Sequence, residues 1–272
     1  MPELPEVETV CRTLAPWLVG RTLYRVDLKW PKLLRETRKE ALSRLIGCRI
    51  RGLRRRGKMI FIDFESGRTL LFHLKMTGQL FLASKAEPRD RHLRLILTFD
   101  NPDLELRFRD PRKFGYLMVF PTAEETKLPF LNRLGPEPES LSRRRFLSLF
   151  SRHKGKIKPL LLRQDFIAGI GNIYADEILH EAGIHPERAV NSLTDEELGR
   201  LYNAMKRILA RAIRHRGTSV RDYRDGLGGR GSFQNQLKVY GRQGKKCRRC
   251  QATVERKKVS GRSAFFCPGC QA

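Results

Sequence analysis

The first half of the chain alternates between apolar and polar residues in short runs, as half-buried β-strands do. Residues 104–109 alternate without interruption, and residues 93–99 carry a leucine or phenylalanine at every second position. Five further runs have strand character, at 22–29, 50–55, 59–64, 69–75 and 114–120. Short strands at this spacing predict a β-sandwich or barrel.

Helical periodicity marks the N-terminus and the second half of the chain. Apolar residues repeat at helical intervals between Val7 and Leu18, and Pro5 suits the first turn of such a helix. Residues 173–182 and 194–215 also have helical spacing, and a capping box opens the second run. The segment 217–232 holds five glycines and few apolar residues, which predicts a mobile loop.

These patterns predict a multidomain α+β protein. We expect an N-terminal β-sandwich domain with flanking helices over residues 1–131 and a linker over 132–141. A helical domain over 142–236 follows, with the glycine-rich loop 217–232 inside it, and residues 237–272 form a small terminal domain.

The net charge of the chain predicts a polyanionic binding partner. The 272 residues include 55 Lys and Arg against 29 Asp and Glu, a formal net charge of +26. Much of it falls in three blocks nearly free of acids, at 49–58, 141–158 and 242–262. Lys and Arg that neutralise phosphates release counterions, so nucleic acid is the expected partner. No membrane span or export signal is evident, and we expect a soluble cytoplasmic protein.

Four of the six cysteines predict a metal site. Cys247 and Cys250 form one C-x-x-C pair and Cys267 and Cys270 form another, with sixteen residues between the pairs. This spacing is typical of tetrahedral zinc sites in which a β-hairpin joins two knuckles. Two disulfides or a redox pair are the alternatives, but nothing indicates an oxidising compartment and no βαβ pattern accompanies the pairs. Four thiolates leave no position for water, so one zinc ion would be structural.

The extreme N-terminus offers covalent chemistry. If Met1 is removed, Pro2 becomes a secondary amine, and an α-amine is partly unprotonated and nucleophilic at neutral pH. Its condensation with a sugar carbonyl gives an iminium cation, which withdraws electrons, and the adjacent Glu3 can deliver a proton to a sugar oxygen. The alternative is a purely structural role as a helix N-terminus, in which the proline suits the first turn and the acids complement the helix dipole.

Seven motifs stand along the chain in a fixed order. They are PELPE at 2–6, RGK at 56–58, HLKMTG at 73–78, DPRKFG at 110–115, LGPEP at 134–138, GIGNIY at 169–174 and the terminal four-cysteine finger. In order and spacing, over essentially the whole chain, they resemble those of bacterial formamidopyrimidine-DNA glycosylases. The N-terminal PELPE distinguishes the chain from the related endonuclease VIII branch, which begins PEGPE.

The resemblance implies a bifunctional base-excision-repair enzyme that removes 8-oxoguanine and formamidopyrimidines from double-stranded DNA and then cuts the strand. Pro2 would form the Schiff base, with Glu3 as proton donor. Lys58 matches the proton donor of β-elimination, and Arg262 matches an arginine associated with δ-elimination. The resemblance also implies a helix-two-turn-helix in the helical domain. It further implies that the protein is a monomer and is associated with the bacterial nucleoid.

The resemblance further assigns residues to the DNA. Met76, Arg112 and Phe114 match side chains inserted where the damaged nucleotide leaves the stack, although by residue type alone Met76 and Phe114 belong in a core. The positions that resemble DNA-backbone contacts are His73, His92, Arg152, Asn172 and Tyr240. The loop that closes over the flipped base would include Thr218, Ser219, Val220, Arg221 and Tyr223.

Three other functions fit parts of the sequence. A non-catalytic zinc-finger regulator would also be basic and bind DNA. An endonuclease VIII-like enzyme would prefer oxidised pyrimidines. A ribosome-associated RNA binder suits the charge but gives no reason for PELPE.

Overall fold

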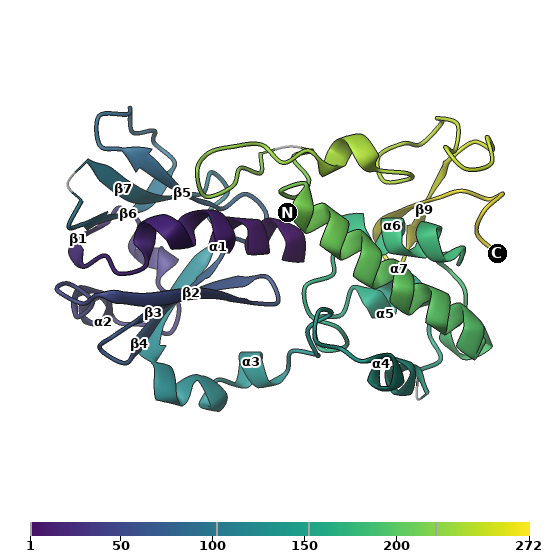
Figure 1. Cartoon of the computed structure of the whole chain (residues 1–272), viewed down its shortest axis with the longest axis horizontal. Coiled ribbons are helices and arrows are strands. Elements are labelled where there is room, and N and C mark those ends of the chain that lie inside the picture. Colours follow the sequence, from purple (N-terminus) through teal and green to yellow (C-terminus); the bar gives the residue numbers. More distant parts are fainter. Residues whose placement is uncertain (1, 102, 152, 221) are drawn as a thin grey trace. The chain divides into compact units, whose positions relative to one another are not determined.

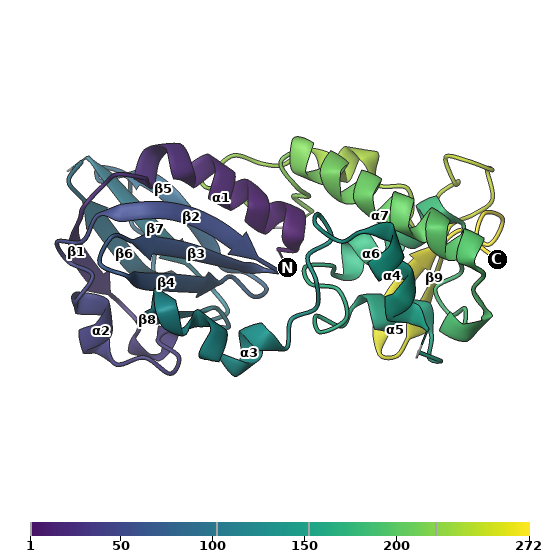
Figure 2. The same cartoon turned by 60° about the horizontal axis from the view of Figure 1, so that its bottom comes forward.

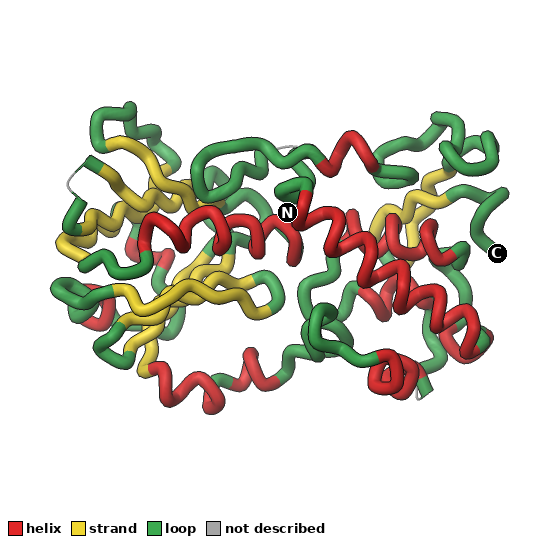
Figure 3. The backbone as a smooth tube through the Cα atoms, in the orientation of Figure 1, coloured by secondary structure: helices red, strands yellow, loops and turns green. Residues whose placement is uncertain are grey.

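The computed structural model describes residues 2–101, 103–151, 153–220 and 222–272. They form two compact units. The first unit comprises Met1–Asn132 and His215–Gln234, and the second comprises Arg133–Arg214 and Asn235–Ala272. Strands dominate the first and helices the second (Figure 3).

The first unit contains two antiparallel four-stranded sheets, which confirms the predicted sandwich. One sheet has the order β1 (Leu23–Leu28), β6 (Leu93–Phe99), β7 (Leu104–Arg109), β5 (Gln79–Ser84). The other has the order β2 (Ile50–Arg56), β3 (Met59–Phe64), β4 (Arg68–His73), β8 (Tyr116–Pro121). Seven of these strands lie where the alternation predicts them, and β5 is the strand that the pattern missed.

Helix α1 (Leu4–Leu18) joins the two sheets along one side. It contacts β2 and β5, which are edge strands of different sheets (Figures 1 and 2). Its apolar side chains, including Val7, Val10 and Leu14, are fully buried in a core that both sheets share. The helix therefore starts on a rigid support, which fixes the position of the residues at its N-terminus.

The glycine-rich segment packs against this same side of the first unit, whereas the sequence-based division placed it in the helical domain. The backbone N–H of Leu82 in β5 donates to the carbonyl of Gly226 at 2.8 Å. The N–H of Gly226 in turn donates to the hydroxyl of Thr13 in α1 at 3.0 Å. These long-range hydrogen bonds attach the segment to α1 and β5, beside which Figure 1 draws it.

The second unit holds the longer helices after the linker and the terminal hairpin. Its longer elements are α4 (Arg143–Phe150), α5 (Ile157–Leu161), α6 (Asn172–Ala182), α7 (Asp195–Arg214), β9 (Glu255–Val259) and β10 (Arg262–Phe266). The structure confirms the two predicted helices as α6 and α7. The predicted hairpin is β9 and β10, which pair in antiparallel register around Ser260 and Gly261.

Short helices complete the described part of the chain. They are the α-helices α2 (Lys39–Ser43) and α3 (Pro129–Asn132) and the 3-10 helices η1 (Pro31–Leu33), η2 (Thr122–Lys127), η3 (Val190–Ser192) and η4 (Phe233–Gln236). In the described part of the chain, no helix has the length and apolar character that crossing a membrane requires.

Candidate functional site

The N-terminal residues that offer covalent chemistry are held in place. Pro2 and Glu3 are both buried, and Glu3 is the N-cap of α1. The backbone N–H of Glu3 donates to Oε2 of Glu6 at 2.8 Å. Pro5 lies in the first turn, as predicted. A nucleophile at Pro2 would therefore start from an ordered position.

Glu6 also holds the glycine-rich segment, a role that the sequence analysis did not assign. Its Oε1 accepts the backbone N–H of Thr218 at 2.7 Å, and its carbonyl accepts the hydroxyl of Tyr223 at 3.2 Å. A side chain at Gly217, where φ is +78°, would meet the Glu6 carboxylate at 2.8 Å. The first turn of α1 and the start of this segment thus form one hydrogen-bonded cluster within the first unit.

The segment itself is closed by its own side chains. Ser219 accepts the N–H of Gly231 at 2.9 Å and donates to the carbonyl of Tyr223 at 3.0 Å. Asp225 is fully buried and forms an ion pair with Arg216 at 2.5 Å. Thr218, Ser219 and Tyr223 are buried, while Val220 is half exposed. Arg221 lies outside the described residues.

Lys58 lies in the turn between β2 and β3. Gly57 precedes it with φ of 57°, and Lys58 is only 8 % exposed. Arg55 connects this turn to α1: its guanidinium donates to the carboxylate of Glu8 at 2.9 Å and to the carbonyl of Gly57 at 3.1 Å. Both views place the β2–β3 turn at the same end of the first unit as the N-terminus (Figures 1 and 2).

His73 ends β4, and the sheet register sets it opposite Met59, next to Lys58. Its Nδ1 accepts the backbone N–H of Lys75 at 3.0 Å. Burial, with the nearby charges of Lys75, Lys58 and Arg35, lowers the pKa of His73 to about 3. The imidazole is therefore neutral at pH 7 with its proton on Nε2, so it can donate a hydrogen bond but carries no positive charge.

Met76 and Phe114 are exposed, which corrects the expectation from residue type that they belong to a core. Their exposed fractions are 44 % and 51 %. Each follows a lysine in the left-handed region: φ is 53° at Lys75 and 60° at Lys113. Such backbone conformations cost free energy in non-glycine residues and cluster at functional sites. The two loops thus present a thioether and an aromatic ring to solvent.

Asp110 connects these two loops, and only a tertiary structure could reveal this. Its buried carboxylate accepts the hydroxyl of Thr77 at 2.5 Å and the backbone N–H of Gly115 at 2.7 Å. The N–H of Arg112 also points to it, at 3.3 Å, and the Arg112 guanidinium lies 4.8 Å from the centroid of the Phe114 ring. Asp110 thereby orders both loops around one charge.

His92 is half-buried just before β6. Its backbone N–H donates to the carboxylate of Asp90 at 2.6 Å, and its carbonyl accepts the N–H of Asp110 at 2.9 Å. This position at the start of a strand is compatible with the contact to the DNA backbone that the resemblance implies for His92.

In the second unit, α6 holds the hairpin that carries Arg262. Arg262 is exposed at the start of β10. The carbonyl of the next residue, Ser263, accepts Nζ of Lys158 at 2.6 Å and Nδ2 of Asn172 at 3.0 Å. Lys158 is itself ion-paired with Asp176 at 2.7 Å in a fully buried position.

A second carboxylate of α6 positions Tyr240. Glu177 is fully buried and accepts the backbone N–H groups of Lys238, Val239 and Tyr240 at 2.8 to 3.0 Å. Burial raises the pKa of Glu177, and these three donors oppose that shift. The Tyr240 ring packs against Phe265 of β10 with centroids 5.2 Å apart. Asn172, Tyr240 and Arg262 therefore belong to one framework, whereas Arg152 lies outside the described residues.

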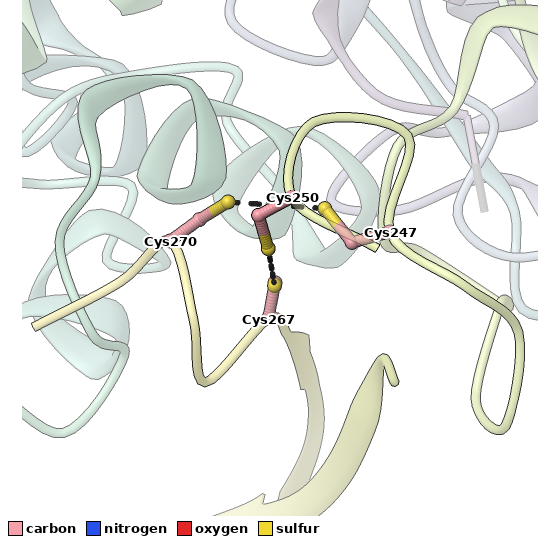
Figure 4. A group of neighbouring side chains, drawn as sticks. All are labelled: Cys247, Cys250, Cys267 and Cys270. Atoms are coloured by element: carbon pink, nitrogen blue, oxygen red, sulfur yellow. Dashed lines mark hydrogen bonds between the residues drawn. The ribbon is translucent and has the colours of Figure 1, made fainter. Parts of the chain in front are cut away.

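The four predicted metal ligands converge. Their sulfur atoms lie within 4.8 Å of one another, and in Figure 4 the four side chains point toward a common centre. Cys247 and Cys267 are buried, Cys270 is intermediate and Cys250 is exposed. Four sulfurs at this separation fit one tetrahedral zinc ion in a closed site.

Comparison with known proteins agrees with this geometry. Three family models match the chain: "Formamidopyrimidine-DNA glycosylase N-terminal domain" at residues 1–117, "Formamidopyrimidine-DNA glycosylase H2TH domain" at 134–224, and "Zinc finger found in FPG and IleRS" at 244–272. The last match confirms a zinc finger at the four cysteines.

Curated relatives match from end to end. The formamidopyrimidine-DNA glycosylase of Desulforamulus reducens is 44 % identical over 275 residues, covering 100 % of this chain and 99 % of the relative. That of Carboxydothermus hydrogenoformans is 44 % identical over 274 residues, covering all of both chains.

Solved structures match equally well. Lactococcus lactis FPG mutant G226P in complex with a Fapy-dG containing DNA has a TM-score of 0.93 at 39 % identity, with 99 % of each chain covered. L. lactis Fpg with an abasic site containing DNA has a TM-score of 0.93 at 38 % identity, again covering 99 % of each. By sequence and by fold, the chain belongs to the formamidopyrimidine-DNA glycosylase family.

Proposed function

We propose that this protein is a bifunctional DNA glycosylase and abasic-site lyase that removes oxidised purines from double-stranded DNA. The observation that carries the proposal is a buried Pro2–Glu3 pair at the start of α1, in a chain 44 % identical along its whole length to formamidopyrimidine-DNA glycosylases. The DNA complexes of the L. lactis proteins with Fapy-dG and abasic sites support the choice of substrate.

The first step uses the amine of Pro2 after Met1 is removed. The amine nitrogen attacks C1′ of the damaged nucleotide, so the N–C1′ bond forms and the glycosidic bond breaks with its electron pair leaving on the base. The proton of the amine passes to the departing base. Glu3 protonates the sugar ring oxygen, so the ring opens to an iminium ion. Because the iminium nitrogen has no proton to lose, it stays cationic.

The second step uses that cation to cut the strand. Loss of a proton from C2′ sends an electron pair toward the iminium, and the 3′ phosphate leaves. Repetition along the conjugated chain expels the 5′ phosphate. Lys58, buried in the β2–β3 turn, is the proton donor of β-elimination. Arg262, exposed on the zinc hairpin, binds the phosphate that leaves in δ-elimination.

DNA binding precedes this chemistry. Met76 and Phe114 enter the space that the flipped nucleotide leaves, and Arg112 offers donors to the unpaired base opposite. The DNA backbone is bound by five further residues: His73, His92, Arg152, Asn172 and Tyr240. Thr218, Ser219, Val220, Arg221 and Tyr223 close over the flipped base, starting from the position that Glu6 fixes.

Zinc acts structurally in this account. Cys247, Cys250, Cys267 and Cys270 would hold one ion, which would reinforce the small core around Val239 and Val254 and so support the hairpin that carries Arg262. We further infer that the protein works as a monomer in the bacterial cytoplasm, in association with the nucleoid.

Cleavage of defined duplexes tests the substrate class. Duplexes that contain one 8-oxoguanine, one formamidopyrimidine or one thymine glycol are incubated with the protein, and strand cutting is measured before and after alkaline treatment. We expect cutting of the two purine lesions without alkali, to products with phosphate at both ends. Preferential cutting of thymine glycol would instead indicate the specificity of endonuclease VIII-like enzymes, and binding without cutting would indicate a regulator.

A further inference from the structure

One buried histidine in the second unit contacts a cysteine of the zinc site. His180 lies in the last turn of α6 and is 1 % exposed. Its Nε2 is 3.6 Å from Sγ of Cys247, within the range of an N–H···S hydrogen bond. None of the steps proposed above uses this residue.

The other ring nitrogen indicates which tautomer is present. Nδ1 of His180 is buried and has no hydrogen-bond partner among the residues that the structure describes. A proton on Nδ1 would leave a buried N–H without an acceptor, at a cost of about 1–3 kcal/mol, and would turn the Nε2 lone pair toward the sulfur. Because a thiolate can only accept, the contact is a hydrogen bond only when the proton is on Nε2. A zinc-bound cysteine is a thiolate and accepts such a hydrogen bond.

The surrounding contacts fix the ring against this knuckle. The guanidinium of Arg249, two residues after Cys247, donates to the carbonyl of His180 at 3.2 Å and to the carboxylate of Glu181 at 3.3 Å. The backbone N–H of Arg249 points to Sγ of Cys247 at 3.4 Å. Helix α6 and the first knuckle are thus clamped together, and Cys247 has two N–H donors directed at its sulfur.

The four cysteines are not equally protected. Cys247 is fully buried and receives these two donors, whereas Cys250 is exposed. Partners of this kind, one shell outside the metal, orient the ligand and change metal affinity by roughly 10–100-fold. Each donor withdraws charge from the thiolate, which makes the sulfur less basic and less prone to protonation or attack when the metal site opens.

We propose that His180 is a positioning residue of the zinc site, whose Nε2–H donates to the Cys247 thiolate and slows loss of the ion. The proposal rests on zinc occupancy of the four-cysteine site and not on the enzymatic reaction. It therefore stands or fails separately from the proposed glycosylase activity.

The experiment compares zinc retention in the full-length, zinc-loaded protein and two variants. His180→Phe keeps an aromatic ring of similar size but removes the donor, and His180→Gln keeps an N–H donor. A colorimetric chelator in excess measures the rate of zinc release, and competition with a chelator of known affinity measures binding. We expect His180→Phe to bind zinc roughly tenfold more weakly and His180→Gln to recover most of this loss.

Two further measurements separate the hydrogen bond from simple packing. His153→Phe is the matched control, because His153 is a histidine of the same unit whose ring packs edge-on against Phe166. Cobalt-substituted protein reports directly on the sulfur: loss of a donor should move the thiolate-to-cobalt charge-transfer band of His180→Phe to longer wavelength. Neither His153→Phe nor His180→Gln should show this shift.

Three results would overturn the proposal. The first is zinc affinity and a cobalt spectrum in His180→Phe that equal those of the unchanged protein. The second is equal loss in His180→Phe and His180→Gln, which would show that ring packing alone matters. The third is equal loss in His153→Phe, which would show a general weakening of the unit.

Discussion

The carboxylate of Glu6 accepts the backbone N–H of Thr218 at 2.7 Å, joining two residues that are 212 positions apart in sequence. The same carboxylate accepts the N–H of Glu3. One buried side chain therefore fixes both the residue beside the proposed nucleophile and the segment proposed to close over the flipped base.

Replacing Glu6 with Gln should loosen both attachments. A carboxamide has one acceptor oxygen, so its NH2 group would face one of the two backbone N–H donors. An unmet buried donor costs about 1–3 kcal/mol. We expect faster hydrogen exchange at Thr218 and Ser219 and slower base release. Glu40→Gln, at an exposed position in α2, is the control. Unchanged exchange at 217–219 would contradict the proposed anchoring.

Alanine at Met76 and at Phe114 should separate stability from DNA binding. Both side chains are half exposed, so truncation should change the free energy of unfolding by less than about 1 kcal/mol, whereas burial in a core would make the cost 2–5 kcal/mol. Binding to a duplex with an abasic site should weaken clearly. Denaturant unfolding and fluorescence anisotropy measure the two effects. A large loss of stability with intact DNA binding would contradict this prediction and would indicate that both side chains belong to the core.

The Lys158–Asp176 ion pair makes a third prediction. Lys158→Met leaves a buried carboxylate without its counter-charge, which should destabilise the second unit by roughly 3–5 kcal/mol. Asp176→Asn in the same chain keeps an acceptor for the N–H of Phe265 and should restore most of this loss. Urea unfolding measures the effect, with the exposed Lys154→Met as control. An additive loss in the double variant would contradict the pairing.

The loss of stability in Lys158→Met should also depend on pH, and it should grow as pH rises. Burial already raises the pKa of Asp176 to about 7, and loss of Lys158 raises it further. A carboxyl with a raised pKa binds its proton more readily in the folded state, so it favours folding at low pH and opposes folding as pH rises. The deficit of Lys158→Met should therefore be smaller at pH 5 than at pH 8.

His73 should make the first unit sensitive to acid. In the folded protein burial lowers its pKa to about 3, while the unfolded chain takes up the proton near pH 6.5. Between these values the unfolded state binds more protons, so stability falls as pH falls. His73→Gln should flatten the stability profile in this window. His92→Gln controls for the loss of a histidine, and an equal slope in both proteins would contradict the assignment.

Alternation and spacing predicted most of the fold because they record local geometry. A strand with one buried face repeats every two residues, which is why β6 and β7 were evident. Strand β5 was missed because four consecutive apolar residues, 80–83, hide the alternation. Helix α4 is not evident from the sequence because it begins with three arginines, which belong to the basic block 141–158.

The site was predictable only where residue chemistry is local. The spacing of the four cysteines predicts a zinc site, and a proline at position 2 predicts a secondary amine at the N-terminus. The hydrogen bonds of Glu6 and Asp110 join loops far apart in sequence, and no local pattern encodes them. The same reason explains the segment 217–232: its glycines are evident in the sequence, but its partners Thr13 and Leu82 lie in distant elements.

The central claim is that the amine of Pro2 forms the covalent bond to damaged DNA, and borohydride trapping followed by peptide mass spectrometry tests it most directly. The protein is incubated with an 8-oxoguanine duplex and reduced, and the cross-linked peptide is sequenced. The account predicts a sugar adduct on the nitrogen of Pro2 in protein that has lost Met1, and no adduct in protein that retains it. An adduct on Lys58, or full trapping with Met1 still attached, would contradict it.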